Sequence, residues 1–405
     1  MKSVLSAVIS IGLLASAGAN PFVKDVTLTQ SPSDGAVTIG YTLGGEPAVV
    51  TVDVQTNGVS IGGRNFRCVS GDVNRYVETL GAKTVTWIPQ TEFPFAETGS
   101  LRAVVTAYST NDAPDYVVYN IENSMTNAAS YYASEDALPY AVTNEIYKTR
   151  RLLMRKIRAS GVTWAMGCRS GYSSAQSSDQ RVHYVTLTED FYIGVYELTQ
   201  KQWSLLQKGS YFAPQLAGCK GDAYPYGDHG YSGVFGQVTG EFRVRLGAPS
   251  LTLPTEAQWE FAARAGCDAP IYNGLQANES GDEEAKRAFG AVAWCKANSD
   301  NLLHVVGEKE PNAWGLYDML GNVMEFTRDY YTEWDSAGDG KTFVDPFNGE
   351  KVGNVGHVLR GGSYTGAYTM IRVDGRYHYT NLSDNDSAGY GYNSGYRLLK
   401  GPGIW

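Results

Sequence analysis

The chain of 405 residues has few of the side chains on which most metal, redox and nucleic-acid sites depend. It contains five cysteines and five histidines, and its 33 Lys and Arg residues are outnumbered by 42 Asp and Glu residues. The resulting net charge of −9 argues against a nucleic-acid partner, because such partners are bound by basic surfaces. Beyond the first 20 residues no apolar run approaches the roughly 18 residues of a membrane span. We therefore expect neither a nucleic-acid partner nor a membrane span.

The cysteines and histidines also lack the spacing of a metal motif. No two cysteines form a Cys-x-x-Cys pair, and no histidines show His-Glu-x-x-His or His-x-His spacing. An oxidising compartment would permit disulfides, although an odd number leaves at least one thiol unpaired. The sequence thus predicts buried thiols or one or two disulfides whose pairing stays open. The cysteines are Cys68, Cys168, Cys219, Cys267 and Cys295.

The N-terminal segment of residues 1–19 has the pattern of a secretory signal peptide. Lys2 precedes an apolar run from Val4 to Leu14, and small residues follow at Ala17 and Ala19. We exclude this segment from the fold. The pattern predicts a secreted, periplasmic or cell-surface protein.

Residues 22–121 read as a succession of short strands. Segments such as "DVTLTQ", "AVTIGYTL" and "TVTWIP" alternate apolar and polar residues, and turn signals such as "SPSDG" and "TNG" separate them. This pattern predicts a small all-β sandwich of immunoglobulin or fibronectin type III character, with Trp87 in its core. Residues 122–150 lack sustained periodicity and are expected to form a linker with at most one short helix.

The remaining residues, 151–405, are expected to form a second domain with few helices. Two helices are marked by capping boxes: Thr199 with Gln202 in "LTQKQWSLLQKG", and Thr255 with Gln258 in "LPTEAQWEFAARAG". Beyond the second helix, short apolar runs alternate with many Gly, Asn and Asp residues. The sequence predicts an α+β fold with much irregular structure.

Six motifs in this second region resemble, in order, those of the formylglycine-generating enzymes, or sulfatase-modifying factors. They are "GVTWAMG", "FYIGVYELTQKQW", "LPTEAQWEFAARAG", "PNAWGLYDMLGNVMEF", "LRGGSY" and "GYRLL". The resemblance implies a loop-rich, C-type-lectin-like fold over residues 151–405. It also implies an oxidoreductase that converts a sulfatase cysteine to formylglycine.

The residues that perform this oxidation in the family are not matched here. Its active members carry two cysteines shortly after the Gly-Gly-Ser motif, and those thiolates bind copper(I), which prefers sulfur ligands. Ser363 matches the serine, but the cysteine positions fall on Gly366 and Ile371. We therefore expect no catalytic residue and no copper site. Formylglycine generation stays the alternative, which requires thiolates from elsewhere, such as Cys267 or Cys295.

A calcium site of the family is matched at all four positions. The resemblance implies side-chain ligands from Asp318 and Glu325 and main-chain oxygens from Gly321 and Val323. Carboxylate and carbonyl oxygens are the ligands that Ca²⁺ prefers. We expect a structural calcium ion in this loop.

The segment from Tyr364 to Ser394 combines many tyrosines with Asn, Asp, Ser and Gly, as binding loops of antibodies do. It predicts a surface that binds a protein, peptide or glycan. The same composition resembles that of diversified variable proteins, and it would also fit tyrosines that simply fill a loop-rich fold. Arg360 and Arg397, which flank the segment, are expected to pair with buried acids or carbonyls. The predicted ligand-binding residues are Ser363, Tyr364, Arg372, Arg376, Tyr377, Tyr379, Asn381, Asp384 and Tyr392.

Overall fold

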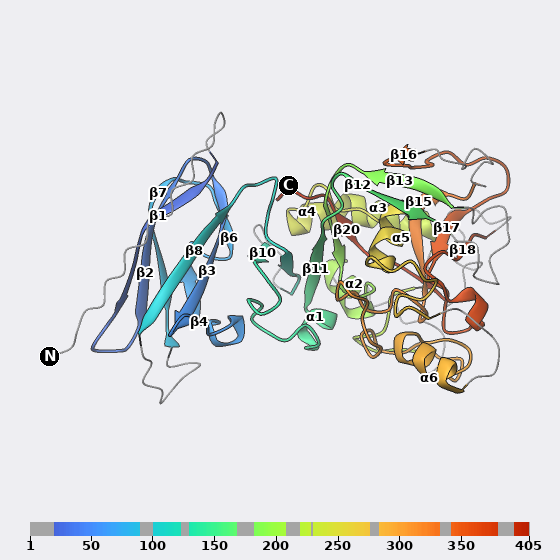
Figure 1. Ribbon diagram of the computed structural model, residues 1–405, viewed down its shortest axis with the longest axis horizontal. Helices are drawn as coiled ribbons and strands as arrows, with labels where there is room; N and C mark the ends of the chain where they lie inside the picture. The colour runs from blue at the N-terminus through green and yellow to red at the C-terminus, as the bar shows by residue number, and fades with distance from the viewer. Residues whose placement is uncertain are drawn as a thin grey trace. The chain divides into compact units, whose positions relative to one another are not determined.

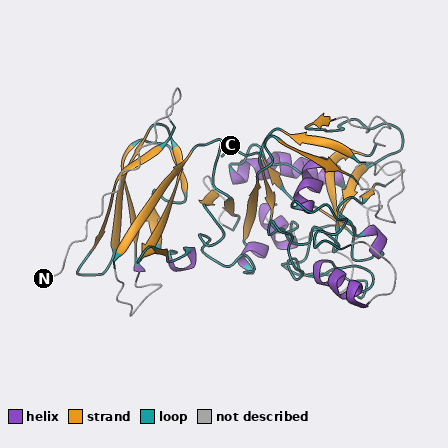
Figure 2. Ribbon diagram, viewed as in Figure 1, coloured by secondary structure: helices purple, strands orange, loops and turns teal. Residues whose placement is uncertain are grey.

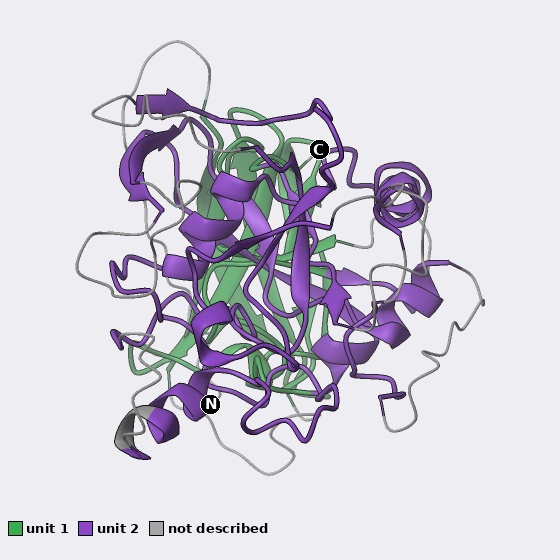
Figure 3. Ribbon diagram, turned by 90° about the vertical axis from the view of Figure 1, so that its right-hand side faces the viewer, with its two compact units in different colours: residues 1–118, 129–144, 402–404 green, residues 119–128, 145–401, 405 purple. Residues whose placement is uncertain are grey.

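A computed structural model describes residues 20–89, 100–122, 129–167, 182–207, 219–227, 230–275, 283–332, 342–379 and 393–404. The chain forms two compact units (Figure 3). The first comprises residues 1–118, 129–144 and 402–404, and the second comprises residues 119–128, 145–401 and 405. The predicted signal peptide lies outside the described residues. No described helix is long and apolar enough to cross a membrane.

The first unit is built from two antiparallel sheets (Figure 1). One sheet has the strand order β1-β2-β7-β5; in the other, β3 lies between β4 and β6 and also pairs with β8. The strands are β1 (Phe22–Gln30), β2 (Val37–Gly44), β3 (Ala48–Thr56), β4 (Val59–Ser60), β5 (Val69–Gly71), β6 (Arg75–Val77), β7 (Gly81–Trp87) and β8 (Leu101–Tyr108), with a 3₁₀ turn η1 at Gly63–Asn65.

The core of this unit follows from the alternation in its strands. In β2, Val37, Ile39 and Tyr41 are buried, whereas Thr38 between them is exposed. Trp87, at the end of β7, is fully buried and packs against Phe66 with ring centroids 5.6 Å apart. The prediction that Trp87 is a core residue is confirmed.

The stretch expected to be a linker contains regular structure in its described part. It holds strand β10 (Ala129–Tyr132) and the short helix α1 (Ile146–Thr149), and β9 (Tyr116–Asn120) precedes it. Tyr131 N–H donates to Asn74 O at 2.9 Å, which ties β10 to the first unit. Residues 129–144 therefore belong to the first unit rather than to a free connection.

The second unit consists of short strands and helices joined by long loops (Figure 2). One sheet has the order β18-β17-β15-β19, another the order β12-β13-β16, and β14 pairs with β11 and β20. Its strands are β11 (Arg151–Ile157), β12 (Val162–Met166), β13 (His183–Leu187), β14 (Phe191–Gly194), β15 (Met324–Tyr330), β16 (Thr342–Val344), β17 (His357–Arg360), β18 (Arg376–Tyr377), β19 (Ser394–Gly395) and β20 (Leu399–Lys400). Its helical segments are α2 (Gln200–Leu206), α3 (Tyr231–Gln237), the π-helix η4 (Val238–Phe242), α4 (Arg243–Leu246), α5 (Glu256–Arg264), α6 (Glu283–Val292) and the 3₁₀ turn η6 (Tyr368–Met370).

The two predicted capping boxes are confirmed. The Thr199 hydroxyl accepts from the N–H of Gln202 at the start of α2, and the Gln202 side chain accepts from the Thr199 N–H. Thr255 and Gln258 repeat this exchange at the start of α5. Each box satisfies two backbone donors that a helix start would otherwise leave without partners.

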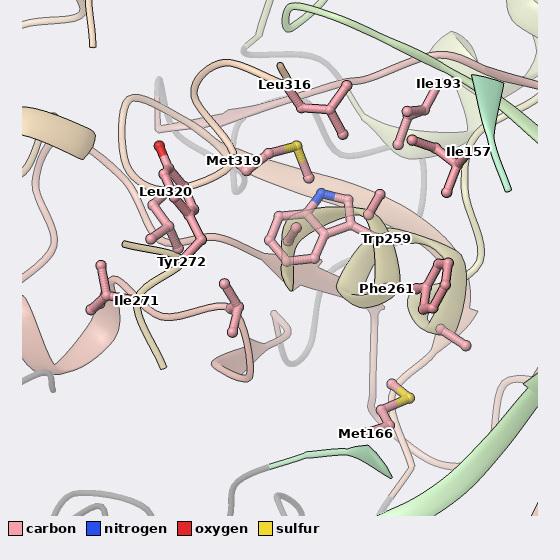
Figure 4. Packing of buried hydrophobic residues seen from close by; sticks show 14 of the residues in the cluster. Ile157, Met166, Ile193, Trp259, Phe261, Ile271, Tyr272, Leu316, Met319 and Leu320 are labelled. Carbon is pink, nitrogen blue, oxygen red and sulfur yellow. The ribbon is translucent and has the colours of Figure 1, made fainter. Parts of the chain in front are cut away.

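Helix α5 contributes several side chains to a large core of the second unit (Figure 4). Its Trp259 is fully buried among side chains that include Leu316, Met319 and Leu320, while Phe261 packs against the rings of Trp164 and Trp314. The same core contains Ile371, from the loop after η6. Burying Trp259 also requires a partner for its indole N–H, and this partner, Glu325 on β15, ties the core to the candidate site.

Candidate functional site

The two positions that match the catalytic cysteines lie side by side. Gly361 and Gly362, with φ of 87° and 74°, turn the chain after β17 in a conformation that favours glycine. A Cβ atom placed on Gly366 would lie 3.0 Å from Cδ1 of Ile371. The backbone thus brings residues 366 and 371 close enough for two side chains to share a ligand, but neither residue carries a metal-ligating group.

Ile371 fills this place with apolar atoms. Its side chain is fully buried within the core around Trp259. A Cβ atom on Gly362 would approach Cδ1 of Ile371 to 2.6 Å, so the isoleucine closes onto the glycine turn itself. At the two positions where active family members carry thiolates, this chain therefore has only hydrocarbon groups, which pack against one another and cannot bind copper(I).

Substitute thiolates would have to come from other cysteines of the chain. Cys219, Cys267 and Cys295 form no disulfide among the described residues, and Cys168 lies outside them. Cys295 precedes Lys296, whose N–H donates to Gly366 O at 3.1 Å, so it is close in sequence to a residue that contacts one of the two matched positions. Burial raises the pKa of the Cys295 thiol, which favours the less nucleophilic protonated form.

Two residues predicted to contact a ligand are buried. Ser363 is 3% exposed, and its Oγ lies 3.1 Å from Oγ1 of Thr365. Tyr364 is 4% exposed and packs in a small apolar cluster with Leu303 and Val323. Tyr364 therefore fills the fold, as the alternative interpretation of the tyrosines proposed.

The two predicted binding arginines are committed to buried ion pairs. Arg372 Nε and Nη2 donate to the carboxylate of Asp374 at 2.7 and 2.8 Å. Arg376 donates to both oxygens of Glu256, at 2.5 and 2.9 Å. Both guanidinium groups are buried, so their position favours a structural role beneath the predicted surface. It does not favour direct contact with a ligand.

Tyr377 and Tyr379 are the predicted residues that remain partly exposed. The Tyr377 hydroxyl donates to Met370 O at 2.9 Å, and the Tyr379 hydroxyl donates to Oδ1 of Asn393 at 3.2 Å. These contacts anchor both rings by their polar ends. The predicted residues Asn381, Asp384 and Tyr392 lie outside the described residues.

The predicted calcium loop turns sharply at two residues. Asp318 has a positive φ of 55°, and Gly321 has a φ of 78°. A Cβ atom on Gly321 would approach the carbonyl oxygen of Trp294 to 2.1 Å, so no other residue fits there. The Asp318 carboxylate is buried; its Oδ2 accepts from Gly307 N–H at 2.6 Å, while its Oδ1 has no hydrogen-bond donor within the described structure.

The other predicted carboxylate ligand, Glu325, is already fully engaged. Arg397 donates to both of its oxygens at 2.6 to 3.0 Å, and Trp259 Nε1 donates to Oε2 at 2.6 Å. The prediction that Arg397 pairs with a buried acid is confirmed, as is that for Arg360, which pairs with Glu260. The donor set therefore fits a cation at Asp318 but leaves no free lone pair on Glu325.

Sequence inspection missed a third buried acid, Glu197. Its carboxylate accepts from Val323 N–H at 3.2 Å and from Nδ2 of Asn322 at 2.8 Å, so it faces the same loop. Burial, followed by the charges of Asp318 and Glu325, raises the pKa of Glu197 well above its usual value. Burial likewise raises the pKa of Asp318 to about 6. Ionisation of Glu197 is therefore disfavoured beside the two other acids, and an added cation would offset this repulsion.

Comparison with known proteins assigns the part of the chain that holds this site to a family. The family model of the sulfatase-modifying factor enzyme 1-like domain matches residues 156–400, which is more than half of the chain. This chain belongs to that family. The chain is 33% identical over 116 residues to a formylglycine-generating enzyme of Thermomonospora curvata, a match that covers 28% of this chain and 38% of that protein. The shared part is thus well under two thirds of that relative's length.

Other proteins to which this chain is similar differ in the roles that their names state. The inactive C-alpha-formylglycine-generating enzyme 2 of Mus musculus is 38% identical over 82 residues, covering 20% of this chain and 26% of that protein. The chaperone protein LppX of Paenibacillus barcinonensis is 26% identical over 265 residues, covering 56% and 85%. Among solved structures, Treponema denticola variable protein 1 shares 22% identity with a TM-score of 0.49 and covers 65% of this chain and 98% of that one.

The sequence around Glu197, the acid that sequence inspection missed, gives only a weak indication of its role. Glu197 stands within the family motif "FYIGVYELTQKQW", where an acid is flanked by Tyr196 and Leu198 in an otherwise apolar segment. A carboxylate in such a segment must be buried beside a donor or a cation. That argument predicts a buried partner, but not that the partner is the loop of Asp318.

Proposed function

We propose that this member of the sulfatase-modifying factor family is a secreted, non-catalytic binding protein that holds a protein or peptide through its Tyr- and Asn-rich C-terminal segment. The observation that carries the proposal is the apolar contact between residues 366 and 371, at the place of the family's thiolates. A copper(I) ion there would face a glycine and an isoleucine, which have no ligand atoms. The remaining candidate, formylglycine generation, needs thiolates from elsewhere in the fold, and burial raises the pKa of the Cys219 and Cys295 thiols, which favours their protonated form.

The ligand class follows from side-chain chemistry and from one relative. Tyrosines offer large contact areas at a small entropy cost, and Asn, Ser and Gly adapt their hydrogen bonds to different partners. The similarity to a chaperone protein, which extends over 56% of this chain, supports a protein or peptide as the first ligand to test. A glycan is the second class. A diversified variable protein is compatible with the same composition.

Two tyrosines of the segment are placed to contact the ligand directly. Tyr377 and Tyr379 are partly exposed and held by their hydroxyl groups, so they offer ring faces already fixed in place. Arg372 and Arg376 act from beneath by tying the segment to Asp374 and Glu256. We propose that Asn381, Asp384 and Tyr392 complete the contact surface.

An oxidation assay tests the catalytic part of the proposal. Residues 20–405 are incubated with copper(I), oxygen and a peptide that carries the sulfatase cysteine motif, and the peptide is weighed by mass spectrometry. We expect no formylglycine from the wild-type protein. The double variant Gly366→Cys, Ile371→Cys is the control, and we expect it to bind copper(I) in a competition titration because the two positions are adjacent. Peptide conversion by the wild-type protein would overturn the proposal.

A segment exchange tests the binding part. Replacing residues 381–392 by Gly and Ser residues of equal number should remove binding to peptide and glycan arrays while leaving the melting temperature of the protein within about 2 °C. As a matched control, the exposed turn at residues 57–58 of the first unit receives Gly-Gly in place of Asn-Gly, because both residues have a positive φ. If the exchanged protein keeps the array signal of the wild type, the segment is not the binding surface.

A further inference from the structure

A cavity of about 280 Å³ in the second unit is lined by residues from the end of β15, the start of α5, β16 and the segment after β16. This volume corresponds to roughly nine water molecules in the liquid, which is enough for a small organic molecule. The lining residues are Glu256, Asp329, Tyr330, Thr332, Phe343, Pro346, Phe347 and Asn348.

The matched cysteine positions Gly366 and Ile371 do not line this cavity. Along the pairing of β15 with β17, Tyr330 is opposite His357, whereas Glu325 is opposite Arg360, directly before the glycine turn. On β15 the lining residues Asp329 and Tyr330 are therefore about five residues, roughly 16 Å, from the end that faces this turn. The tyrosine-rich segment borders the cavity, because Arg376 of that segment binds Glu256 in the cavity wall.

The cavity is lined by both aromatic and acidic side chains. Phe343, Phe347 and Tyr330 contribute rings, and Phe347 is 49% exposed, so its ring is available at the rim. No lysine, arginine or histidine lines the cavity. Rings with negative faces beside carboxylates attract cations and repel anions.

The charges of the two acidic side chains are balanced differently. Glu256 is neutralised by Arg376, which binds both of its oxygens, and by Arg360 at 3.4 Å. Asp329 accepts hydrogen bonds from two backbone N–H groups, of Glu256 at 2.7 Å and of Asn348 at 3.0 Å. Within the described residues Asp329 forms no ion pair, and it is 4% exposed.

The charged groups that act on Asp329 come from two elements. Glu256, on α5, is the nearest acid and raises the pKa of Asp329, and Arg328, its neighbour on β15, lowers it. Burial is the largest cause, and together these effects raise the pKa of Asp329 to about 7. Arg328 lies with its guanidinium 4.5 Å from the ring centre of Phe347, so one ring of the cavity already accepts a cation on one face.

We propose that this cavity binds a small organic cation, an alkylammonium group whose charge meets Asp329 and whose hydrocarbon part lies between the rings of Phe343 and Phe347. The ammonium group would provide the counter-charge that Asp329 lacks among the described side chains. The backbone N–H groups of Glu256 and Asn348 hold the Asp329 carboxylate in position, so this side chain loses little conformational entropy when a ligand binds. The hydrocarbon part fits the apolar wall formed with Pro346.

Three probes of equal length and different charge test this site. Pentylammonium, 1-pentanol and pentanoate are titrated separately into residues 20–405 at pH 8 and followed by ligand-observed NMR. At this pH the ammonium is protonated and Asp329 is mostly ionised. We expect saturable binding of pentylammonium at concentrations up to about 10 mM, weaker binding of pentanol and no binding of pentanoate.

Two variants and a matched control locate the binding. Asp329→Asn should weaken pentylammonium binding about tenfold or more, and Phe347→Leu should weaken it about two- to fivefold because the aromatic face is lost. Phe22→Leu, in the first unit, removes a ring of the same 49% exposure and should leave the titration unchanged. Pentanoate binding as tight as that of pentylammonium, or a pentylammonium titration that Phe347→Leu does not alter, would overturn the proposal. Because Phe347 is half exposed, its variant should stay folded even if Asp329→Asn does not.

Discussion

At the scale of single residues, the buried carboxylates of the second unit divide into two kinds. Arg264 and Arg360 surround Glu260 and lower its pKa to about 2, despite its burial. Asp329 has no such ion pair among the described residues, and burial raises its pKa to about 7. The first kind stabilises the fold when ionised, and the second kind is most favourable when protonated.

This difference predicts a fall in stability as the pH rises. A carboxyl whose pKa is raised on folding binds more protons in the folded than in the unfolded state, so its contribution is complete below about pH 4 and is lost as the pH rises through about 7. For Asp329 the largest loss that this titration can cause in the free energy of unfolding is about 4 kcal/mol. Denaturant titrations between pH 5 and 8 should therefore show a smaller decline for Asp329→Asn than for the wild type. An equal decline in both proteins would contradict the raised pKa.

Residue identity alone does not tell a binding arginine from a scaffold arginine. Arg372 and Arg376 stand in a polar, tyrosine-rich segment, which suggested exposed side chains. Their partners differ in sequence distance: Asp374 is two residues away, whereas Glu256 is 120 residues away. The first pair could be anticipated from local sequence. The pair of Arg376 with Glu256 forms only because the fold brings β18 next to the start of α5, and no local sequence pattern predicts that contact.

At the scale of elements, the helix starts were predictable because capping is a local interaction. The two boxes differ, however, in what their threonines contact. The Thr255 hydroxyl accepts from Gln258 N–H, whereas the Thr199 hydroxyl accepts from Gln202 N–H and also donates to Lys148 O at 2.7 Å. The second threonine therefore joins α2 to α1.

This difference predicts unequal effects of the two alanine substitutions. Thr255→Ala should lower the free energy of unfolding by about 1 kcal/mol, the usual effect of a lost N-cap. Thr199→Ala should lower it by about 2 kcal/mol, because it also leaves the buried carbonyl of Lys148 without its donor. Guanidinium titrations of both variants measure the difference, with Ser in place of each Thr as the conservative control. Equal losses would mean that the link to Lys148 adds no stability.

The strands were less predictable than the helices. In the first unit β2 and β7 alternate over eight and seven residues and could be recognised individually. In the second unit β18, β19 and β20 have two residues each, which is too short for a periodic pattern. The family motifs indicated this region correctly where periodicity could not, because motif order reflects the whole domain.

At the scale of the whole molecule, two compact units with separate cores are expected to respond separately to ligands. If calcium binds at the loop of Asp318, it should stabilise the second unit and leave the first unchanged. The support for this ion is the Oδ1 of Asp318, which has no hydrogen-bond donor among the described residues, and the grouping of three buried acids near Arg397. The engagement of Glu325 with Arg397 is the observation against it.

Calorimetry with and without calcium distinguishes these possibilities. We expect calcium to raise the midpoint of the second unit's transition by several degrees in the wild-type protein, and not in Asp318→Ala. Asp53→Ala, in β3 of the first unit, is the matched control and should keep the response. An equal shift in the wild type and Asp318→Ala, or no shift in either, would remove calcium from this loop.

The pairing of β14 with β20 has a consequence for how the protein is made. Ile193 and Leu399 are partners although about 200 residues lie between them, and Met324 pairs with Ser394 on β19. During synthesis the strands of the first unit emerge early and can pair among themselves. One edge of β14 and one edge of β15, in contrast, stay unpaired until β20 and β19 have been synthesised. For most of translation the second unit therefore exposes unpaired strand edges and apolar side chains. Its yield in a heterologous host is expected to depend on chaperones that bind nascent chains far more than the yield of the first unit does.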